Sequence, residues 1–310
     1  MYPHVRIASL DDVEGIVNVY CSDVEKWWKF VNDKKIEASY DELTVEERYA
    51  HGGPWMSVET CSIHINNLLI NAQYPLVAEL DGKIVGELEL YIGEEKGGLG
   101  KYGFIDILEV HRDYRRKGIG RALVNEAFEI SKRQGCETLA VWPAKEAVGF
   151  YKKCGLDKVA YNIVYLEIDL KKQSLKTLDF SKLCSFPKEY DKKLFLISPI
   201  IFPSFVAWLK NKWRYSFKDE KIIRDKGYIS NLNTAYIIES IWYNKYTANV
   251  FLWTKDTETI SDAIDTVLGI AKYRDFSRAR LYVEENIYKK YLKSYPHRVI
   301  SNEILLIKNI

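Results

Sequence analysis

The sequence predicts an α/β protein in which mixed sheets are flanked by helices, with the chain divided into two units. Two observations lead to this prediction. Short apolar runs typical of strands alternate with amphipathic stretches at helical spacing along the chain. The order β-α-α-β-β-β-α-β-α-β up to about residue 172 is followed, after a polar and lysine-rich segment at 173–193, by a second β-β-α-β-α-β series.

The first 71 residues are expected to form a strand and two helices around an irregular segment. Val5 to Ala8 has the pattern of a short strand. Ser9 is placed to cap a helix with an apolar stripe from Leu10 to Tyr20, and Ser57 is placed to cap another that ends near Asn71. Residues 22–54 between these helices are rich in aromatic and charged side chains, and we expect them to be irregular.

The next residues predict a hairpin, and the elements after residue 136 continue the alternation. Pro75–Leu80 and Lys83–Tyr91 are joined by Asp81-Gly82, which supplies the positive φ that a tight hairpin turn requires. Later in the chain, the expected elements are a strand at Glu137–Trp142, a short helix at Glu146–Cys154 ended by Gly155, and final strands within Tyr161–Leu170.

The stretch from Gly103 to Ala122 is the most informative part of the sequence. An apolar run from Phe104 to Val110 predicts a strand, and apolar residues at helical spacing from Ala122 onward predict a helix. Between them lies Arg115-Arg116-Lys117-Gly118-Ile119-Gly120. Because a helix N-terminus has unpaired N–H groups and glycine lets a ligand approach the backbone, this junction suits a phosphate group.

This junction resembles motif A of the GNAT superfamily, the acetyl-CoA-dependent N-acetyltransferases, whose signature is Gln/Arg-x-x-Gly-x-Gly/Ala. Arg115, Gly118 and Gly120 occupy its fixed positions, and Ala147 to Leu156 resembles the later family signature A-x-x-x-Tyr-x-x-x-Gly-Phe. Two competing phosphate loops do not fit, since a Walker A loop needs Gly-Lys-Ser/Thr and a dinucleotide loop needs G-x-G-x-x-G. The resemblance implies a GNAT fold, with a central and mostly antiparallel sheet, for residues 1–172.

The resemblance also implies which residues hold acetyl-CoA. The pyrophosphate is expected on the backbone N–H groups of residues 116–121, with basic side chains adding charge, and the pantetheine arm on the strand before the loop. The residues so assigned are Leu108, Glu109, Val110, Arg115, Arg116, Lys117, Gly118, Ile119, Gly120 and Arg121.

Tyr151 and Asp106 are the candidate catalytic residues. Tyr151 aligns with a family tyrosine that can protonate the departing CoA thiolate, a task that suits a phenol with a pKa of about 10. The alternative is that Tyr151 is a core aromatic on an amphipathic helix. Phe104 stands where some family members have a glutamate base, and Asp106, on the same strand face, is the nearest substitute. Further options are proton removal through water, or by Glu87, Glu89 or Glu109, which we expect to be solvated.

The segment between the first strand and the sheet lies over the acceptor site in the family. Trp27, Trp28, His51 and Trp55 are therefore candidate contacts for the acceptor amine. The alternative is that these aromatic side chains cover the edge of the sheet.

The second half repeats the element order but lacks the glycine loop. Tyr151-Lys152-Lys153 matches Tyr288-Lys289-Lys290, which indicates an internal repeat, whereas residues 255–262 contain acids and no glycine. We expect 173–310 to be a degenerate GNAT-like domain, in tandem with the first. Its expected elements are an apolar run at Leu194–Ile201, helices at Phe205–Trp213, Ile260–Tyr273 and Ile287–Tyr295, and strands at Tyr236–Trp242, Ala248–Trp253, Ala279–Val283 and Glu303–Ile307.

Composition restricts the remaining possibilities. A net charge of +2 from 45 basic and 43 acidic residues gives no general attraction to nucleic acid or membrane. Five scattered cysteines without a C-x-x-C pair argue against disulfides and a metal site, and an N-terminus without an apolar signal core predicts a cytoplasmic protein. We expect a monomer or a homodimer. We expect transfer of acetyl from acetyl-CoA to a primary amine of a small molecule or protein. The alternative is a non-catalytic acyl-CoA sensor.

Overall fold

The computed structural model describes residues 3–31, 34–173, 180–213, 223–241 and 244–310. The helices are α1 (Val13–Cys21), α2 (Val45–Tyr49), α3 (Val58–Ile70), α4 (Ile119–Arg133), α5 (Val148–Lys153), α6 (Ser204–Lys210), α8 (Ile260–Tyr273) and α9 (Glu285–Ile287). The strands are β1 (His4–Ile7), β2 (Trp27–Val31), β3 (Lys34–Ala38), β4 (Tyr74–Leu80), β5 (Lys83–Glu94), β6 (Lys101–Val110), β7 (Thr138–Val141), β8 (Lys158–Asp169), β9 (Leu183–Cys184), β10 (Phe195–Ser198), β11 (Ile223–Ile229), β12 (Thr234–Ile241), β13 (Asn244–Thr254), β14 (Arg278–Glu284) and β15 (His297–Asn309).

Most described strands belong to one mixed sheet. Its order is β1-β4-β5-β6-β7-β15-β8-β14-β13-β12-β11-β9, with β10 paired to β13. The neighbours are antiparallel except for β6 with β7 and β13 with β14, which are parallel pairs. The two parallel pairs lie on either side of β15 and β8, so the strand order is symmetric about that central pair.

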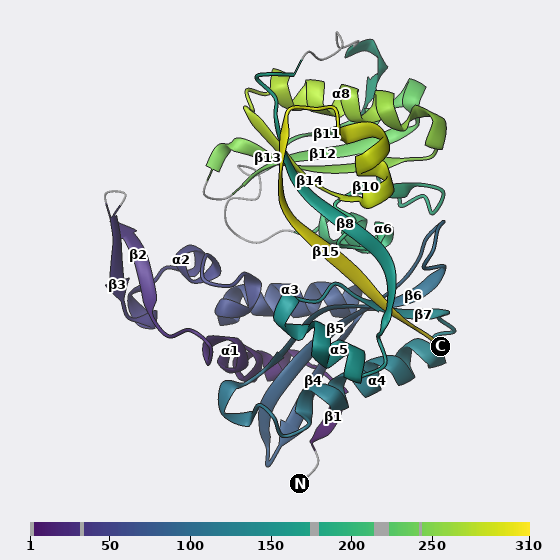
Figure 1. Cartoon of the computed structure of the whole chain (residues 1–310). Coiled ribbons are helices and arrows are strands. Elements are labelled where there is room, and N and C mark those ends of the chain that lie inside the picture. The colour runs from purple at the N-terminus through teal and green to yellow at the C-terminus, as the bar shows by residue number, and fades with distance from the viewer. Residues whose placement is uncertain (1–2, 32–33, 174–179, 214–222, 242–243) are drawn as a thin grey trace.

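The central pair joins the two halves of the molecule. β15, the last strand in the sequence, lies between β7 and β8 and is antiparallel to both. β8 in turn pairs with β14 of the second half. In Figure 1 these two long strands run side by side from the lower half of the molecule to the upper half. The boundary expected near residue 172 therefore divides the sequence but not the sheet, and the two-domain division stays a prediction.

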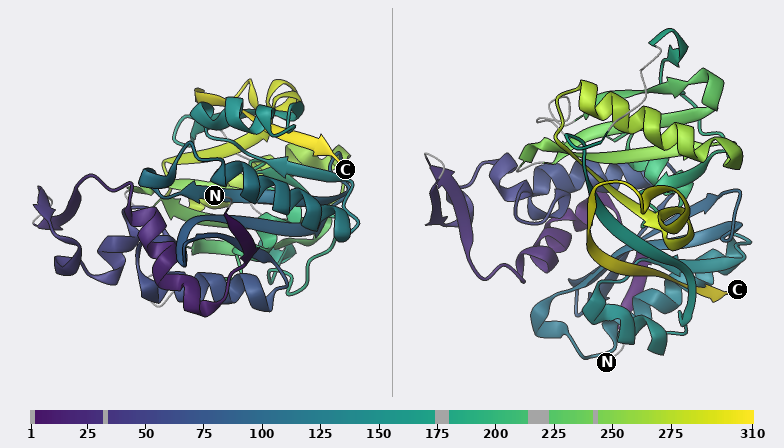
Figure 2. Two further views of the ribbon diagram at one scale, coloured as in Figure 1. Left: turned by 90° about the horizontal axis from the view of Figure 1, so that it is seen from below. Right: turned by 45° about the horizontal axis from the view of Figure 1, so that its top comes forward.

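Helices cover the sheet and enclose separate apolar clusters. α4 packs on the β4–β7 part through Leu123, Val124 and Ala127, whereas α1 and α3 cover its opposite face. α8 covers the strands of the second half. The views in Figure 2 show this layered arrangement and the β2–β3 hairpin standing away from the body. Among the described helices, none is both long and apolar enough to cross a membrane.

Several expected elements differ in detail. The segment 22–54, expected to be irregular, forms the β2–β3 hairpin and α2. The helix α2 begins after Thr44, whose side chain caps it by accepting from the N–H of Glu47 at 3.2 Å. The helix expected at 287–295 is the short α9 followed by a π-helical turn at Tyr288–Leu292. The helix at Ile260–Tyr273 is confirmed at both ends. The end of the strand expected at 236–242 lies outside the described residues.

Candidate active site

β6 parts from its parallel neighbour β7 halfway along its length. Pairing with β7 ends at Ile105, whereas β6 continues to Val110. His111 N–H donates to the carbonyl of Val85 on β5 at 3.0 Å. Because backbone groups of successive residues alternate between the two sides of a strand, those of Leu108 and Val110 face the gap left by β7.

A β-bulge places Asp106 beside the second half of the chain. The register passes from Ile107 opposite Glu89 to Ile105 opposite Leu90, so Asp106 has no partner on β5. Its side chain is 6% exposed and forms an ion pair with Lys210 of α6. Burial raises the pKa of Asp106, and the ammonium of Lys210 opposes that rise.

The turn after β6 presents a row of backbone donors at the start of α4. Gly118 adopts a left-handed conformation, with a φ of 84°, and precedes the first helical residue. The first backbone N–H of this region to find an acceptor is that of Ala122, which donates to Gly118 O at 3.0 Å. Within the part of the chain that the structure describes, the N–H groups of residues 116–121 have no acceptor. These donors meet the positive end of the α4 dipole, an arrangement that suits an anion.

The motif residues around this turn have distinct surroundings. A Cβ atom on Gly120 would lie 3.2 Å from the ring of Phe150 and 3.5 Å from Leu108, so the glycine lets α4 pack closely on α5 and β6. Arg115 donates to Val110 O at 3.0 Å and forms ion pairs with Glu109 and Asp23. Its guanidinium therefore holds the turn against β6, a role that the sequence prediction of a phosphate contact did not include.

The other predicted phosphate contacts leave charge at the surface. Lys117 donates to Asp113 O at 3.0 Å, and its ammonium lies 4.9 Å from the centre of the Tyr114 ring. Arg116 and Arg121 are exposed, whereas Ile119 is buried in the core beneath α4. Ile119 can therefore offer a ligand its backbone N–H but not its side chain.

Tyr151 lies on α5, in the apolar cluster beneath α4. Its side chain is buried, and its ring contacts Phe150 with centroids 5.0 Å apart. Burial raises the pKa of Tyr151, and Cys154 and Glu109 add to the rise. The phenol is therefore protonated near neutral pH. Both readings of Tyr151, as acid and as core aromatic, are compatible with this position.

Glu87 and Glu89 of β5 are buried, and the expectation that they are solvated is wrong. Both are fully shielded from solvent because α1 and α3 cover the face of β5 that carries them. Glu89 Oε1 accepts from Trp55 Nε1 at 2.7 Å and lies 2.7 Å from His64 Nε2. Glu87 Oε2 accepts from the Tyr20 hydroxyl at 2.7 Å.

The two glutamates have opposite pKa shifts. Burial and the charge of Glu89 raise the pKa of Glu87 well above its ordinary value, and its Oε1 has no hydrogen-bond partner among the described residues. Burial also disfavours the ionised form of Glu89, but His64, Lys210 and Trp55 outweigh it and lower the pKa. The surroundings therefore favour the neutral form of Glu87 and the ionised form of Glu89.

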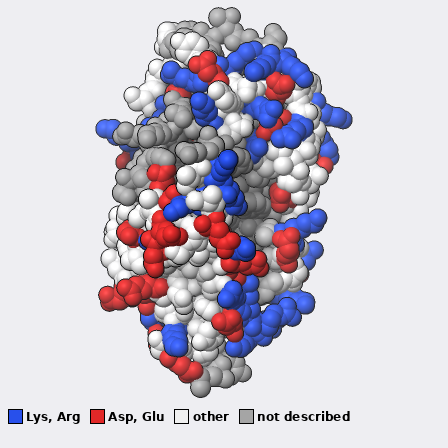
Figure 3. All heavy atoms as spheres, turned by 90° about the vertical axis from the view of Figure 1, so that its left-hand side faces the viewer, with Lys and Arg blue, Asp and Glu red and all other residues white. Residues whose placement is uncertain are grey.

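The four predicted acceptor contacts fall into two places. His51 lies between two tryptophan rings, with centroids 4.7 Å from Trp27 and 4.4 Å from Trp28, and its Nε2 is 2.8 Å from Trp28 O. Trp55 is separate from this group and stacks on Tyr20 at 5.1 Å, beside the buried glutamates. On the side of the molecule that carries the hairpin, acidic side chains gather in the middle and basic ones at the lower right (Figure 3).

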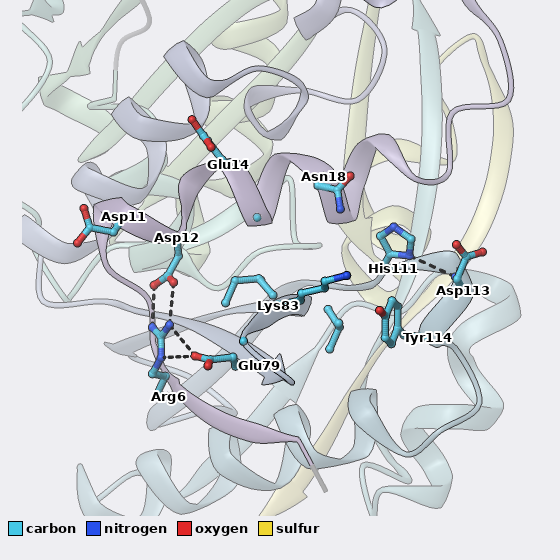
Figure 4. Close-up of a pocket in the computed structure, with 14 residues that line it drawn as sticks. Arg6, Asp11, Asp12, Glu14, Asn18, Glu79, Lys83, His111, Asp113 and Tyr114 are labelled. Carbon is cyan, nitrogen blue, oxygen red and sulfur yellow. Dashed lines mark hydrogen bonds and ion pairs between the residues drawn. The ribbon is translucent and has the colours of Figure 1, made fainter. Parts of the chain in front are cut away.

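A cavity of about 540 Å³ is lined in part by His111, Asp113 and Tyr114 of the turn after β6. Figure 4 shows His111 and Tyr114 at one end of it and Arg6 at the other. Arg6 is fully engaged there, with its Nη1 2.7 Å from Asp12 and its Nη2 3.1 Å from Glu79. Since further acids line this cavity, it is a poor place for a pyrophosphate, and the donors of residues 116–121 remain the better candidate.

Sequence comparisons agree with this geometry. The model of the Acetyltransferase (GNAT) family matches residues 36–156. An uncharacterized N-acetyltransferase of Methanocaldococcus jannaschii is 30% identical over 90 residues, which is 26% of this chain and 38% of the relative. A glucosamine 6-phosphate N-acetyltransferase of Trypanosoma brucei brucei is 34% identical over 76 residues, 24% of this chain and 51% of the relative. The matches thus span about half or less of these relatives.

Solved structures resemble the fold of the whole chain. A putative acetyltransferase from Pyrococcus horikoshii has a TM-score of 0.53 at 14% identity, covering 100% of this chain and 90% of that one. A GCN5-related N-acetyltransferase from Anabaena variabilis has a TM-score of 0.57 at 13% identity, covering 98% and 72%. Residues 36–156 of the chain thus match the GNAT acetyltransferase family model, and the fold of the chain is similar to those of these solved structures.

Proposed function

We propose that this protein is an acetyl-CoA-dependent N-acetyltransferase with one donor site, formed by β6, the turn at 115–118 and α4. The observation that carries the proposal is the run of unpaired N–H groups at 116–121, directly after a strand that has parted from its neighbour. A pyrophosphate suits such donors at a helix N-terminus, and the backbone groups of Leu108 offer an amide-bearing arm hydrogen bonds. Acetyl-CoA, when bound, supplies the activated acetyl group.

Asp106 is the proton acceptor that the surroundings favour. An acceptor amine must lose a proton before its lone pair can attack, so the base has to be ionised. Asp106 has Lys210 as a counter-ion, whereas Glu87 has only the Tyr20 hydroxyl and remains neutral. We assign Tyr151 as the proton donor to the leaving thiolate, because its phenol is protonated and its hydroxyl makes no hydrogen bond to any described residue.

The second half is proposed to be a degenerate copy that holds no second donor. The symmetric strand order about β15 and β8 supports a repeat, with β13, α8 and β14 in the places of β6, α4 and β7. The pairing of β13 with β14 ends at Asn249, where a gap like that beside β6 would begin. There β10 pairs with Leu252 to Thr254 of β13, so a strand of the protein occupies the corresponding space.

Calorimetry on a charge-matched pair of variants tests the donor site. Arg116→Ala with Lys117→Ala removes two positive charges from the N-terminal end of α4, and we expect the affinity for CoA to fall about tenfold or more. Lys132→Ala with Arg133→Ala removes the same charge from the other end of α4 and should leave the affinity nearly unchanged. Equal affinity in both variants would contradict the assignment.

Release of free CoA thiol from acetyl-CoA, measured with a panel of primary amines, tests the reaction. We include amino sugars and their phosphates because one relative is a glucosamine 6-phosphate N-acetyltransferase. Amine-dependent release is expected with at least one acceptor class. Tight acetyl-CoA binding without release for any acceptor would instead indicate an acyl-CoA sensor.

A further inference from the structure

The helix α6 of the second half contacts Asp106, the proton acceptor proposed above. We propose that Lys210, at its C-terminal end, is a positioning residue that keeps Asp106 ionised, and that the second half thereby takes part in catalysis. The inference rests on the function proposed above.

The contacts of Lys210 point to a role at this site. Its ammonium forms an ion pair with Asp106 and lies 4.6 Å from the ring centre of Phe202 and 5.9 Å from that of Tyr91. The side chain of Lys210 is 27% exposed, whereas that of Asp106 is 6% exposed. The charge of Asp106 therefore has little solvent around it and depends on this cation.

Both halves of the molecule hold α6 in place. At its N-terminal end, Ser204 N–H donates to Glu95 of the first half at 2.5 Å, and Ser204 O accepts from Trp253 of the second half at 3.3 Å. Val206 and Leu209 pack in the cluster beneath α1 and α3, whereas Trp208 packs against Trp253. A helix fixed from both sides can present its last side chain at a defined point.

The charges around Asp106 explain why one lysine can determine whether its carboxyl group is ionised. The groups that act on it are Lys210 from α6, His64 from α3, and Glu87 and Glu89 from β5. His64 is engaged with Glu89 at 2.7 Å. Without Lys210, Asp106 would face the ionised Glu89 in a buried setting, and it would take up a proton at a higher pH.

An ionised Asp106 gives the transfer a consistent proton balance. The acceptor binds as an ammonium and passes one N–H proton to an Asp106 oxygen, directly or through a water molecule. The freed lone pair then forms the new C–N bond as the thioester C–S bond breaks, and the departing sulfur takes the Tyr151 proton. The second N–H proton, released as the amide forms, reprotonates the Tyr151 phenolate through water, and Asp106 passes its proton to solvent. If Asp106 is already protonated, the first transfer cannot take place.

The test compares Lys210→Met with Lys212→Met, which removes the same charge from an exposed residue two positions away. With an acceptor that wild type acetylates, kcat is measured from pH 5 to 10, and the affinity for acetyl-CoA is measured by calorimetry. We expect Lys210→Met to move the acidic limb of the kcat profile up by about one pH unit or more, with acetyl-CoA affinity nearly unchanged. Lys212→Met should follow wild type.

Two further measurements keep the result decisive. In the Asp106→Asn background, Lys210→Met should change kcat less than twofold, because the carboxylate through which Lys210 is proposed to assist the proton transfer is gone. If no acceptor supports turnover, the proposed function fails, and carbon-13 NMR of the Asp106 carboxyl decides the role of Lys210. A higher pKa of Asp106 in Lys210→Met supports the inference. An unchanged acidic limb, or an unchanged Asp106 pKa, overturns it.

Discussion

His64 and Glu89 meet inside the protein, with Nε2 and Oε1 2.7 Å apart and side chains that are 2% and 0% exposed. Two residues earlier on the same strand, Glu87 is equally buried but has no cationic partner among the residues that act on it. The surroundings thus favour different protonation states for neighbouring carboxyl groups on one strand face. This difference can be measured through stability.

We expect Glu89→Gln to lower the free energy of unfolding by about 3–5 kcal/mol, because it removes one partner of a buried charged contact. Glu87→Gln should cost less than about 1.5 kcal/mol, since an amide replaces a carboxyl group that is already neutral. Urea unfolding at pH 7 gives both values. Equal losses in the two variants would contradict the assigned protonation states.

Tyr151→Phe separates the two readings of Tyr151. If the phenol protonates the leaving thiolate, removing its hydroxyl should lower kcat by about 100-fold, the lower bound of the usual range for general acid catalysis. The affinity for acetyl-CoA should stay within about twofold, because the ring keeps its contact with Phe150. Single-turnover kinetics and calorimetry measure the two quantities. Wild-type turnover would return Tyr151 to a purely structural role.

Glu95 should make stability depend on pH. Burial raises its pKa from 4.5 to about 7, although the hydrogen bond from Ser204 N–H opposes the rise. Between these values the folded protein binds a proton that the unfolded chain has lost, so the Glu95 contribution to the free energy of unfolding falls as pH rises from 4.5 to 7. Relative to wild type, Glu95→Gln should therefore gain stability across this window in urea titrations. A constant difference between the two proteins would speak against the shifted pKa.

Leu306→Ala should show that β15 supports the half that carries the donor site. Leu306 is fully buried in the cluster beneath α4, so its truncation should lower the free energy of unfolding by about 2–5 kcal/mol. Val299→Ala, on the same strand but 43% exposed, serves as the control and should cost less than about 1 kcal/mol. Chemical denaturation monitored by tryptophan fluorescence measures both. Similar losses would indicate that β15 contributes evenly along its length.

The sequence predicts the local parts of this structure well. Strand and helix patterns locate β6, α4 and α8, and the positive φ of Gly118 agrees with a glycine required at the start of a helix. The motif from Arg115 to Gly120 predicts the proposed donor site, because that site depends on the backbone geometry of six successive residues. Such features need no knowledge of distant contacts.

The remaining features depend on contacts between distant residues. Alternation places Glu87 and Glu89 on one face of β5, but it cannot reveal that helices cover that face. A helix near Phe205–Trp213 is predicted, yet the meeting of Lys210 with Asp106, 104 residues earlier, follows only from the tertiary arrangement. The place of β15 between β7 and β8 is likewise invisible in a list of elements, because element order does not determine strand order.

The position of β15 has a consequence for biosynthesis. A ribosome completes the sequence of the donor turn and of β8 long before it adds residues 297–309, which fill the slot between β7 and β8. At about 5–20 residues per second, the interval is on the order of ten seconds. During that time the edges of β7 and β8 that β15 will cover are open, so the sheet of the nascent first half stays incomplete until β15 has emerged.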